Sequence, residues 1–171
     1  MLTIHTIGHS NHEFDYFLRL LQLVKIEVLV DIRSNPNSGW VSFAEKNALE
    51  KLMTIAGIKY LYMGDVLGGQ PADPTYLNPV TGRADYQLIR RSESFQQGIA
   101  RLVHGCDRYK ICLMCAEENP AHCHRSLLVG EALSHIGVRL FHIRGDERIQ
   151  TDEELSKERA GVSLSQQMLP M

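Results

Sequence analysis

The segment from Cys115 to Arg125 holds the residue types best suited to chemistry in this chain. It reads Cys-Ala-Glu-Glu-Asn-Pro-Ala-His-Cys-His-Arg, so two thiols, a carboxylate and a guanidinium lie close together in sequence. The Asn119-Pro120 pair inside it is typical of a helix start, and this would place Cys123 in the first helical turns. The helix dipole and neighbouring cations lower the pKa of a thiol at such a position.

The first interpretation of this segment is covalent or acid–base catalysis. A cysteine would be the reactive group, and Glu117 would act as a general acid or base at the mouth of the site. The planar guanidinium groups of Arg33 and Arg125 would hold an anionic substrate. Of the 18 cations, 12 are Arg, and this bias favours an anion site.

Two other interpretations fit the same residues. Cys115, Cys123, His124 and His122 are suitable donors for a transition metal, although the spacing C-x7-C-H matches no common zinc pattern. A redox version would join Cys115 to Cys123 in a disulfide. In the third interpretation the cysteines are ordinary core residues and the arginine is salt-bridged at the start of a helix. The closer pair, Cys112 and Cys115, is not expected to act jointly, because residues three apart on a strand face opposite sides.

Several familiar motifs are missing from the chain. No Gly-x-Gly-x-x-Gly follows the first predicted strand, and no Walker-type phosphate loop is present. A Cys-x5-Arg phosphatase loop would need Arg where Ala121 and Val129 stand. The sequence therefore identifies no nucleotide cofactor and leaves a transition metal open.

The elements that must position these residues alternate between strand and helix patterns. Strands are predicted over residues 2–8, 27–33, 59–63, 109–115 and 138–143. Helices are predicted after capping boxes at Ser10–Glu13 and Ser42–Glu45, over 85–103 with a break near 92–94, and from Asn119 to about 136. Residues 64–83 form a long loop.

This alternation predicts an α/β fold, a Rossmann-like three-layer α/β/α sandwich around a mainly parallel five-stranded sheet. Residues 1–150 form one domain, and residues 151–171 form a C-terminal helix or tail with a frayed end. We expect the strand order 3-2-1-4-5, which puts the switch point between the first and fourth strands, where ligands bind.

The candidate site residues gather at the carboxyl ends of the predicted strands. The first strand ends in Gly8-His9-Ser10, the second in Asp31-Ile32-Arg33-Ser34 and the fourth in Cys115-Ala116-Glu117. The catalytic candidates are Cys115, Glu117, Cys123 and His9. The substrate-binding candidates are Ser10, Arg33, Ser34, His124 and Arg125. Asp31 in its buried strand needs a partner, and a face-to-face pairing with Arg33 is not expected.

The net charge and the distribution of apolar residues argue against two classes of protein, nucleic-acid binders and membrane proteins. A chain of 171 residues with a net charge of −2 argues against a nucleic-acid binder held mainly by bulk charge. No apolar run approaches the ~20 residues of a membrane span, and no signal-peptide pattern opens the chain. The four cysteines are therefore expected to be reduced and the protein cytoplasmic.

Four stretches resemble the domain-of-unknown-function family 488 over roughly residues 3–140. They are Thr6-Ile7-Gly8-His9-Ser10, Asp31-Ile32-Arg33-Ser34-x-Pro36-x-Ser38, Leu67-Gly68-Gly69 and Cys115-x-Glu117-x-x-Pro120-x-x-Cys123-His124-Arg125. The resemblance implies a small cytoplasmic prokaryotic protein with a Rossmann-like fold, and it supplies no activity. The family pattern marks the same nine positions that were selected from the strand ends.

The sequence favours an enzyme that acts on a small anionic substrate, phosphorylated or nucleotide-like, at the carboxyl edge of the sheet. One alternative is a nucleic-acid-processing or nucleic-acid-binding protein, which would need a surface formed by Arg83, Arg90, Arg91 and Arg101. The other alternative is a metal-binding or redox protein that uses Cys115, Cys123 and His124.

Overall fold

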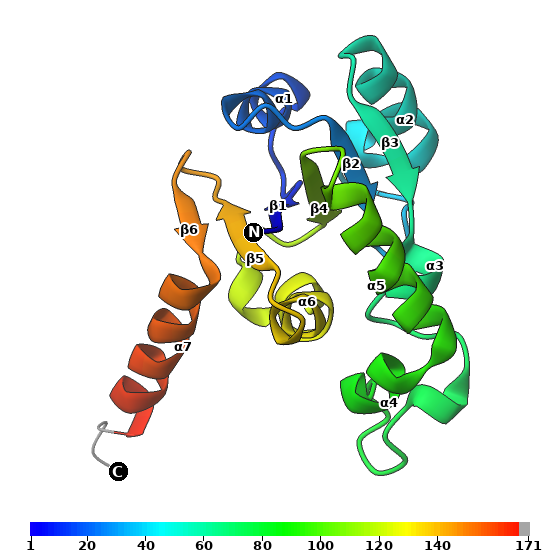
Figure 1. The fold of residues 1–171 in the computed structure, drawn as a ribbon, viewed down its shortest axis with the longest axis vertical. Helices are drawn as coiled ribbons and strands as arrows, with labels where there is room; N and C mark the ends of the chain where they lie inside the picture. Colours follow the sequence, from blue (N-terminus) through cyan, green and yellow to red (C-terminus); the bar gives the residue numbers. More distant parts are fainter. Residues whose placement is uncertain (168–171) are drawn as a thin grey trace.

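The computed structural model of the chain describes residues 1–167, with the side chains of residues 1–161. Six strands form one sheet in the order β3-β2-β4-β1-β5-β6 (Figure 1). The strands are β1 (Thr3–Gly8), β2 (Val28–Asp31), β3 (Lys59–Tyr62), β4 (Ile111–Cys115), β5 (Arg139–Ile143) and β6 (Ile149–Thr151). The first five are parallel and β6 is antiparallel to β5. The predicted five parallel strands are present, and the short β6 is an addition.

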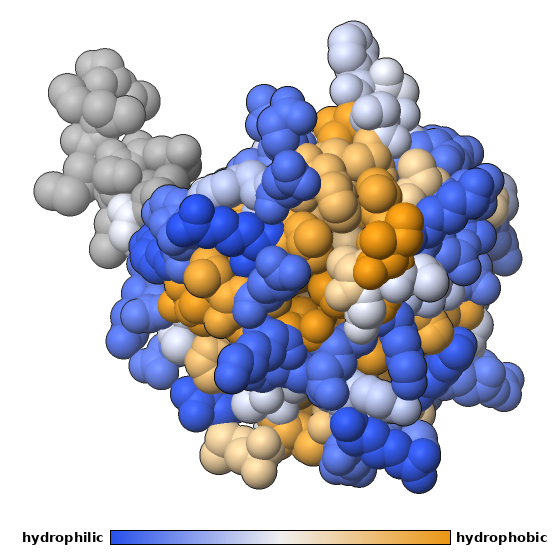
Figure 2. Space-filling view, turned by 90° about the horizontal axis from the view of Figure 1, so that it is seen from above, coloured by the Kyte–Doolittle hydropathy of each residue, from blue (hydrophilic) through white to orange (hydrophobic). Residues whose placement is uncertain are grey.

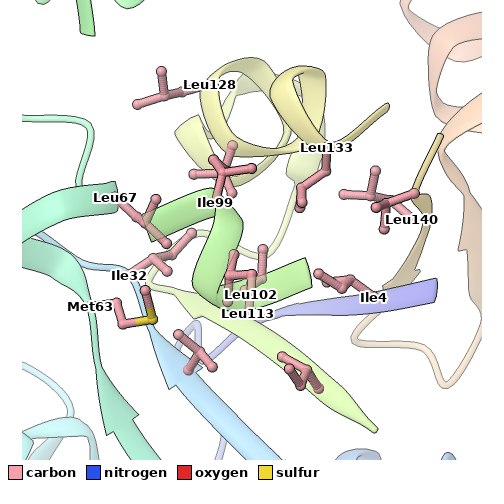
Figure 3. Close-up of a cluster of buried hydrophobic side chains, with 14 of the residues drawn as sticks. Ile4, Ile32, Met63, Leu67, Ile99, Leu102, Leu113, Leu128, Leu133 and Leu140 are labelled. Atoms are coloured by element: carbon pink, nitrogen blue, oxygen red, sulfur yellow. The ribbon is translucent and has the colours of Figure 1, made fainter. Parts of the chain in front are cut away.

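Helices cover both faces of the sheet and give the predicted α/β/α layers (Figure 1). The helices are α1 (Phe14–Leu23), α2 (Lys46–Ile55), α3 (Gly64–Leu67), α4 (Tyr86–Arg91), α5 (Glu93–Cys106), α6 (Glu131–His135) and α7 (Asp152–Gln167). One core cluster joins α1 and α2 to the sheet, and the other joins α5 and α6 to it. Figure 3 shows Ile99 and Leu102 of α5 near Leu113 of β4 in the second cluster.

The alternation of side chains along β4 assigns the cysteines to different faces. Leu113 belongs to the core beneath α5, whereas Cys112 and Met114 belong to the core beneath α1 and α2. Cys112 is fully buried, and burial raises the pKa of its thiol above the ordinary value. The expectation that Cys112 and Cys115 do not face the same side is therefore confirmed.

The predicted strand order 3-2-1-4-5 is wrong, because β4 lies between β2 and β1. The register pairs Gly8 of β1 with Cys115, and Asp31 of β2 with Met114. The order of the strands in the chain and their hydrophobic pattern do not specify which buried strands are neighbours in the sheet. Neighbouring strands are selected by side-chain packing. The observed order brings the ends of β1 and β2 to either side of the end of β4.

Both predicted capping boxes begin their helices too early. Ser10 has a positive φ of 48°, and its N–H donates to the carbonyl of Ala116, so the chain still follows β4 there. Helix α1 begins only at Phe14, without a side-chain cap. In α2 the cap is Glu45 instead of Ser42, since its carboxylate accepts from the N–H groups of Asn47 and Ala48.

The helix predicted from Asn119 to residue 136 is divided. The Asn119 side chain caps a short 3₁₀ turn, Pro120–His122, and Cys123 is then extended with φ −106° and ψ 143°. A π-helical segment, Arg125–Gly130, leads into α6. Wide π turns of this kind are frequent at functional sites, and here the break sets the Cys123 side chain apart from the helix axis.

The C-terminal helix α7 packs on the domain through buried Leu155. The Arg159 guanidinium donates to the carbonyl of Ala121 at 3.1 Å and to Ser126 Oγ at 2.6 Å. Thr151 and Glu154 form a reciprocal capping box at the start of α7. The frayed end predicted for the chain concerns residues 168–171, which lie outside the described residues.

The surface view in Figure 2 shows apolar side chains in the middle of one face with hydrophilic side chains around them. Single large apolar residues such as Trp40 and Ile55 are exposed, which is normal for a globular protein. Among the described residues, no helix has both the length and the apolar character needed to cross a bilayer.

Candidate functional site

A cavity of about 240 Å³ lies at the carboxyl ends of β2 and β4. Six of the nine predicted site residues line it: Arg33, Ser34, Cys115, Glu117, Cys123 and His124. The other three predicted residues, His9, Ser10 and Arg125, do not line it. Most of the residues chosen from the strand ends therefore line one cavity, and the remaining three lie outside its lining.

Cys115 and Cys123 form the wall of the cavity and touch each other. Both are unbridged thiols with 2% of their surface exposed, and their Sγ atoms are 2.7 Å apart. Two sulfurs that share one tetrahedral zinc ion lie about 3.8 Å apart, so this pair is packed for direct S–S contact. The described residues contain no group of three or more His, Cys, Asp or Glu side chains placed to hold a metal ion.

The two thiols ionise differently. Burial alone would raise the pKa of Cys115, but the hydrogen bond from Cys123 and the charge of Arg125 outweigh it, and that pKa lies below the ordinary thiol value. The hydrogen bond to Cys115, together with burial, raises the pKa of Cys123. The two shifts are opposite, so Cys115 loses its proton more readily than Cys123, and the Cys123 thiol is then the hydrogen-bond donor.

Arg125 is the buried cation whose charge lowers the pKa of Cys115. It is fully buried, and its Nη2 donates to the carbonyl of Glu118. Its Nε and Nη1 have no hydrogen-bond partner among the described residues, which also provide no carboxylate within ion-pair distance. A buried charge costs several kcal/mol unless it is compensated, and the charge of Arg125 lowers the pKa of both the Cys115 thiol and the Glu118 carboxyl. Arg125 was predicted to bind substrate, but it is fully buried and does not line the cavity.

Arg33 reaches the cavity as part of a buried network. Its Nε and Nη2 donate to the two carboxylate oxygens of Asp31 at 2.9 and 2.7 Å, and Tyr60 OH donates to the same carboxylate at 2.6 Å. The expectation that Asp31 would not pair with Arg33 is therefore wrong. Residues i and i+2 share a face, and β2 ends at Asp31, so the following backbone is free to turn the Arg33 side chain back onto the carboxylate.

His9 supports Arg33 instead of contacting the cavity. Its Nδ1–H donates to the carbonyl of Ser10 at 2.8 Å, which leaves Nε2 to accept from Arg33 Nη1 at 3.3 Å. Burial is the main cause that lowers the pKa of His9 below its ordinary value. A neutral His9 is therefore the form that accepts from the guanidinium. The Ser10 hydroxyl contacts only Asn11.

His124 closes the cavity beside Cys123. Its Nε2–H donates to the carbonyl of Ile32 at 2.8 Å, and its Nδ1 lies 3.8 Å from Cys123 Sγ. Burial is the main cause that lowers the pKa of His124, so the imidazole is neutral near pH 7. In this tautomer Nδ1 is an acceptor directed at the Cys123 thiol.

The Glu117–Glu118 segment is anchored from both sides. A Cβ on Gly8 would lie 1.8 Å from the carbonyl oxygen of Glu117, so only glycine lets β1 approach this closely. Glu118 accepts from Arg144 and from the N–H of Gly145, and these contacts lower the pKa of its carboxyl to about 2 despite partial burial. Glu117 itself is exposed at the cavity mouth.

The residues that sequence reasoning missed come from the loop over residues 64–83 and the start of α4. They are Gln70 and Tyr86, and His122, which the sequence had offered as a metal donor, lines the cavity too. The signal that could have found the loop is the Gly68-Gly69 pair. A Cβ on Gly68 would meet Ser34 Oγ at 2.2 Å, and one on Gly69 would meet His124 Cβ at 2.7 Å. These two glycines let the loop cover the site.

We expect Gly69→Ala to destabilise the protein by about 1–3 kcal/mol, because the added methyl group overpacks the site against His124. Gly39→Ala is the matched control, since its Cβ would meet no atom within 4 Å. Thermal unfolding of both variants measures the effect. Equal melting temperatures for the two would show that the loop does not pack on His124.

Comparison with known proteins adds a family but no activity. No curated protein and no solved structure matches the chain. The model of one family, Domain of unknown function DUF488, matches residues 13–132, which is well over half of the chain and includes the Cys115–Arg125 segment. The chain therefore belongs to the DUF488 family, as its motifs indicated.

Proposed function

We propose that this protein is a thiol-dependent enzyme that acts on a small anionic substrate, with the Cys115 thiolate as its nucleophile. The observation that carries the proposal is the contact of Cys115 with the buried Cys123 thiol at the wall of a cavity, and the charge of the buried Arg125 lowers the pKa of Cys115 there. A thiolate held in this way is the reactive form of cysteine. A dithiol of this kind suits a reducing compartment, the cytoplasm.

The other cavity residues supply matching roles. Arg33 lines the cavity, and Nη1 is the guanidinium nitrogen that Asp31 leaves unused, so it is the donor for an anionic group. His9 and Asp31 hold it in that orientation. The exposed Glu117 carboxylate at the mouth is the general acid or base.

Thiol alkylation tests the nucleophile and the anion site together. We expect iodoacetamide to modify Cys115 of the native protein with a pH midpoint below that of an ordinary thiol, and inorganic phosphate to slow the reaction. Peptide mass spectrometry assigns the modified residue. Cys106 is the internal control, because burial raises the pKa of its thiol to about 11. An ordinary midpoint for Cys115, together with no effect of phosphate, would contradict the proposal.

The nucleic-acid alternative gains no support from the arginines it requires. Arg90 is drawn into an ion pair with Glu131 at 3.1 Å and donates to the carbonyl of Leu127. The small cavity suits a small molecule better than a polymer. We therefore propose an enzyme and not a nucleic-acid-binding protein.

A further inference from the structure

We propose that Cys115 and Cys123 form a peroxide-reactive dithiol, in which a hydroperoxide oxidises Cys115 and Cys123 resolves the product to a reducible disulfide. The inference deepens the proposed function, because it uses the same Cys115 nucleophile. It rests on the direct contact of the two sulfurs, on their burial and on their position in the cavity lining.

The first step follows from the position of Cys115. A hydroperoxide that enters the cavity meets the Cys115 sulfur at its wall. An electron pair of the thiolate attacks the distal oxygen, the O–O bond breaks, and the alkoxide that leaves takes a proton from solvent. The sulfur is oxidised by two electrons to a sulfenic acid, and the peroxide is reduced to an alcohol, or to water in the case of hydrogen peroxide.

The second step needs a resolving thiol with a nearby base, and both are present. Cys123 Sγ lies 2.7 Å from Cys115 Sγ, and neutral His124 presents Nδ1 to the Cys123 thiol at 3.8 Å. His124 accepts the proton, the Cys123 sulfur attacks the Cys115 sulfur, and the S–O bond breaks. The oxygen leaves as water with that proton, and the S–S bond forms. An external dithiol returns the pair to its reduced form and is itself oxidised to a disulfide.

The charges around the pair make the disulfide easy to reduce. Oxidation removes the Cys115 thiolate, which the charge of Arg125 favours, and this arginine is fully buried with two nitrogens unpartnered among the described residues. The reduced form is therefore stabilised relative to the disulfide, which is the condition for an oxidising and reversible pair. We expect the oxidised protein to melt at a lower temperature than the reduced protein, the opposite of a structural disulfide.

The experiment treats the native protein with one equivalent of hydrogen peroxide and analyses it by peptide mass spectrometry. We expect an intramolecular Cys115–Cys123 disulfide that dithiothreitol reverses, formed at least tenfold faster than any oxidation of Cys106. In Cys123→Ser the reaction is expected to stop at a Cys115 sulfenic acid that dimedone traps. Cys106→Ser, which leaves the pair intact, is expected to behave as the unmodified protein.

Three outcomes would overturn the inference. They are an unreactive pair, a disulfide that involves Cys106, and a disulfide that raises the melting temperature. The unmodified protein gives a decisive answer even if a variant fails to fold. If phosphate-sensitive alkylation of Cys115 is found without disulfide formation, the redox inference fails and the proposed function stands. If the disulfide forms and phosphate does not slow the alkylation of Cys115, the proposal of an anionic substrate is contradicted instead.

Discussion

Cys115→Ser is expected to destabilise the protein by about 3–5 kcal/mol, because it removes the thiolate whose charge interacts with that of the fully buried Arg125. The double variant Cys115→Ser/Arg125→Met is expected to be more stable than Cys115→Ser alone, since the uncompensated charge is then replaced by an apolar group of similar length. Denaturant unfolding of the four proteins in this double-mutant cycle measures the coupling between the two residues.

Cys123→Ser is the matched control for this cycle, because it keeps the Cys115 thiolate and a hydroxyl donor beside it. We expect Cys123→Ser to lower the free energy of unfolding by less than Cys115→Ser does. Additive effects of Cys115→Ser and Arg125→Met would show that the thiolate and the guanidinium do not interact, and would remove the physical basis of the proposed nucleophile.

The Cys115–Cys123 pair also makes the free energy of unfolding depend on pH. In the folded protein the pKa of Cys115 lies below its ordinary value. Its contribution to the free energy of unfolding is therefore complete above the ordinary thiol pKa and is lost as the pH falls through the folded pKa. The raised pKa of Cys123 acts in the opposite direction, because its contribution is lost as pH rises above the ordinary value. The pair therefore stabilises the protein most near the ordinary thiol pKa, and this stabilisation declines at lower and at higher pH.

Asp31→Asn is the second change with a large expected effect, again about 3–5 kcal/mol. The fully buried Asp31 carboxylate accepts two hydrogen bonds from the Arg33 side chain and one from Tyr60, and its loss leaves a buried guanidinium uncompensated. Urea unfolding monitored by circular dichroism gives the free energy, with an unchanged slope expected if only stability changes.

Two further variants give reference values for the loss of stability in Asp31→Asn. Tyr60→Phe removes one hydrogen bond to the same carboxylate and is expected to cost about 1–3 kcal/mol. Asp107→Asn changes an exposed carboxylate and is expected to stay within about 0.5 kcal/mol of the unmodified protein. A cost for Asp31→Asn no larger than that for Asp107→Asn would mean that the Asp31–Arg33 pair does not form.

The sequence predicted the elements well where a local pattern specifies them. The break at Ser92 between α4 and α5 follows from a side-chain cap, and Gly57 and Gly137 end their helices with positive φ. The capping box at Ser10 failed because a tertiary contact takes precedence there. Its N–H donates to the carbonyl of Ala116 and holds Ser10 in the left-handed conformation.

The position of the cavity was also predictable, because the carboxyl ends of parallel strands share one edge of the sheet. Which of the candidate residues line it was not. Arg33 and Arg125 are both signature arginines in sequence, yet Arg33 lines the cavity and Arg125 is fully buried outside its lining. Sequence spacing does not report which side of a turn a long side chain takes.

Periodicity and strand-end residues are local properties, and they were enough to predict an α/β fold with the candidate site residues at one edge of the sheet. The place of β4 between β2 and β1, and the contact of Cys123 with Cys115, are visible only in the folded protein. Both features depend on packing between segments that a local sequence pattern does not describe.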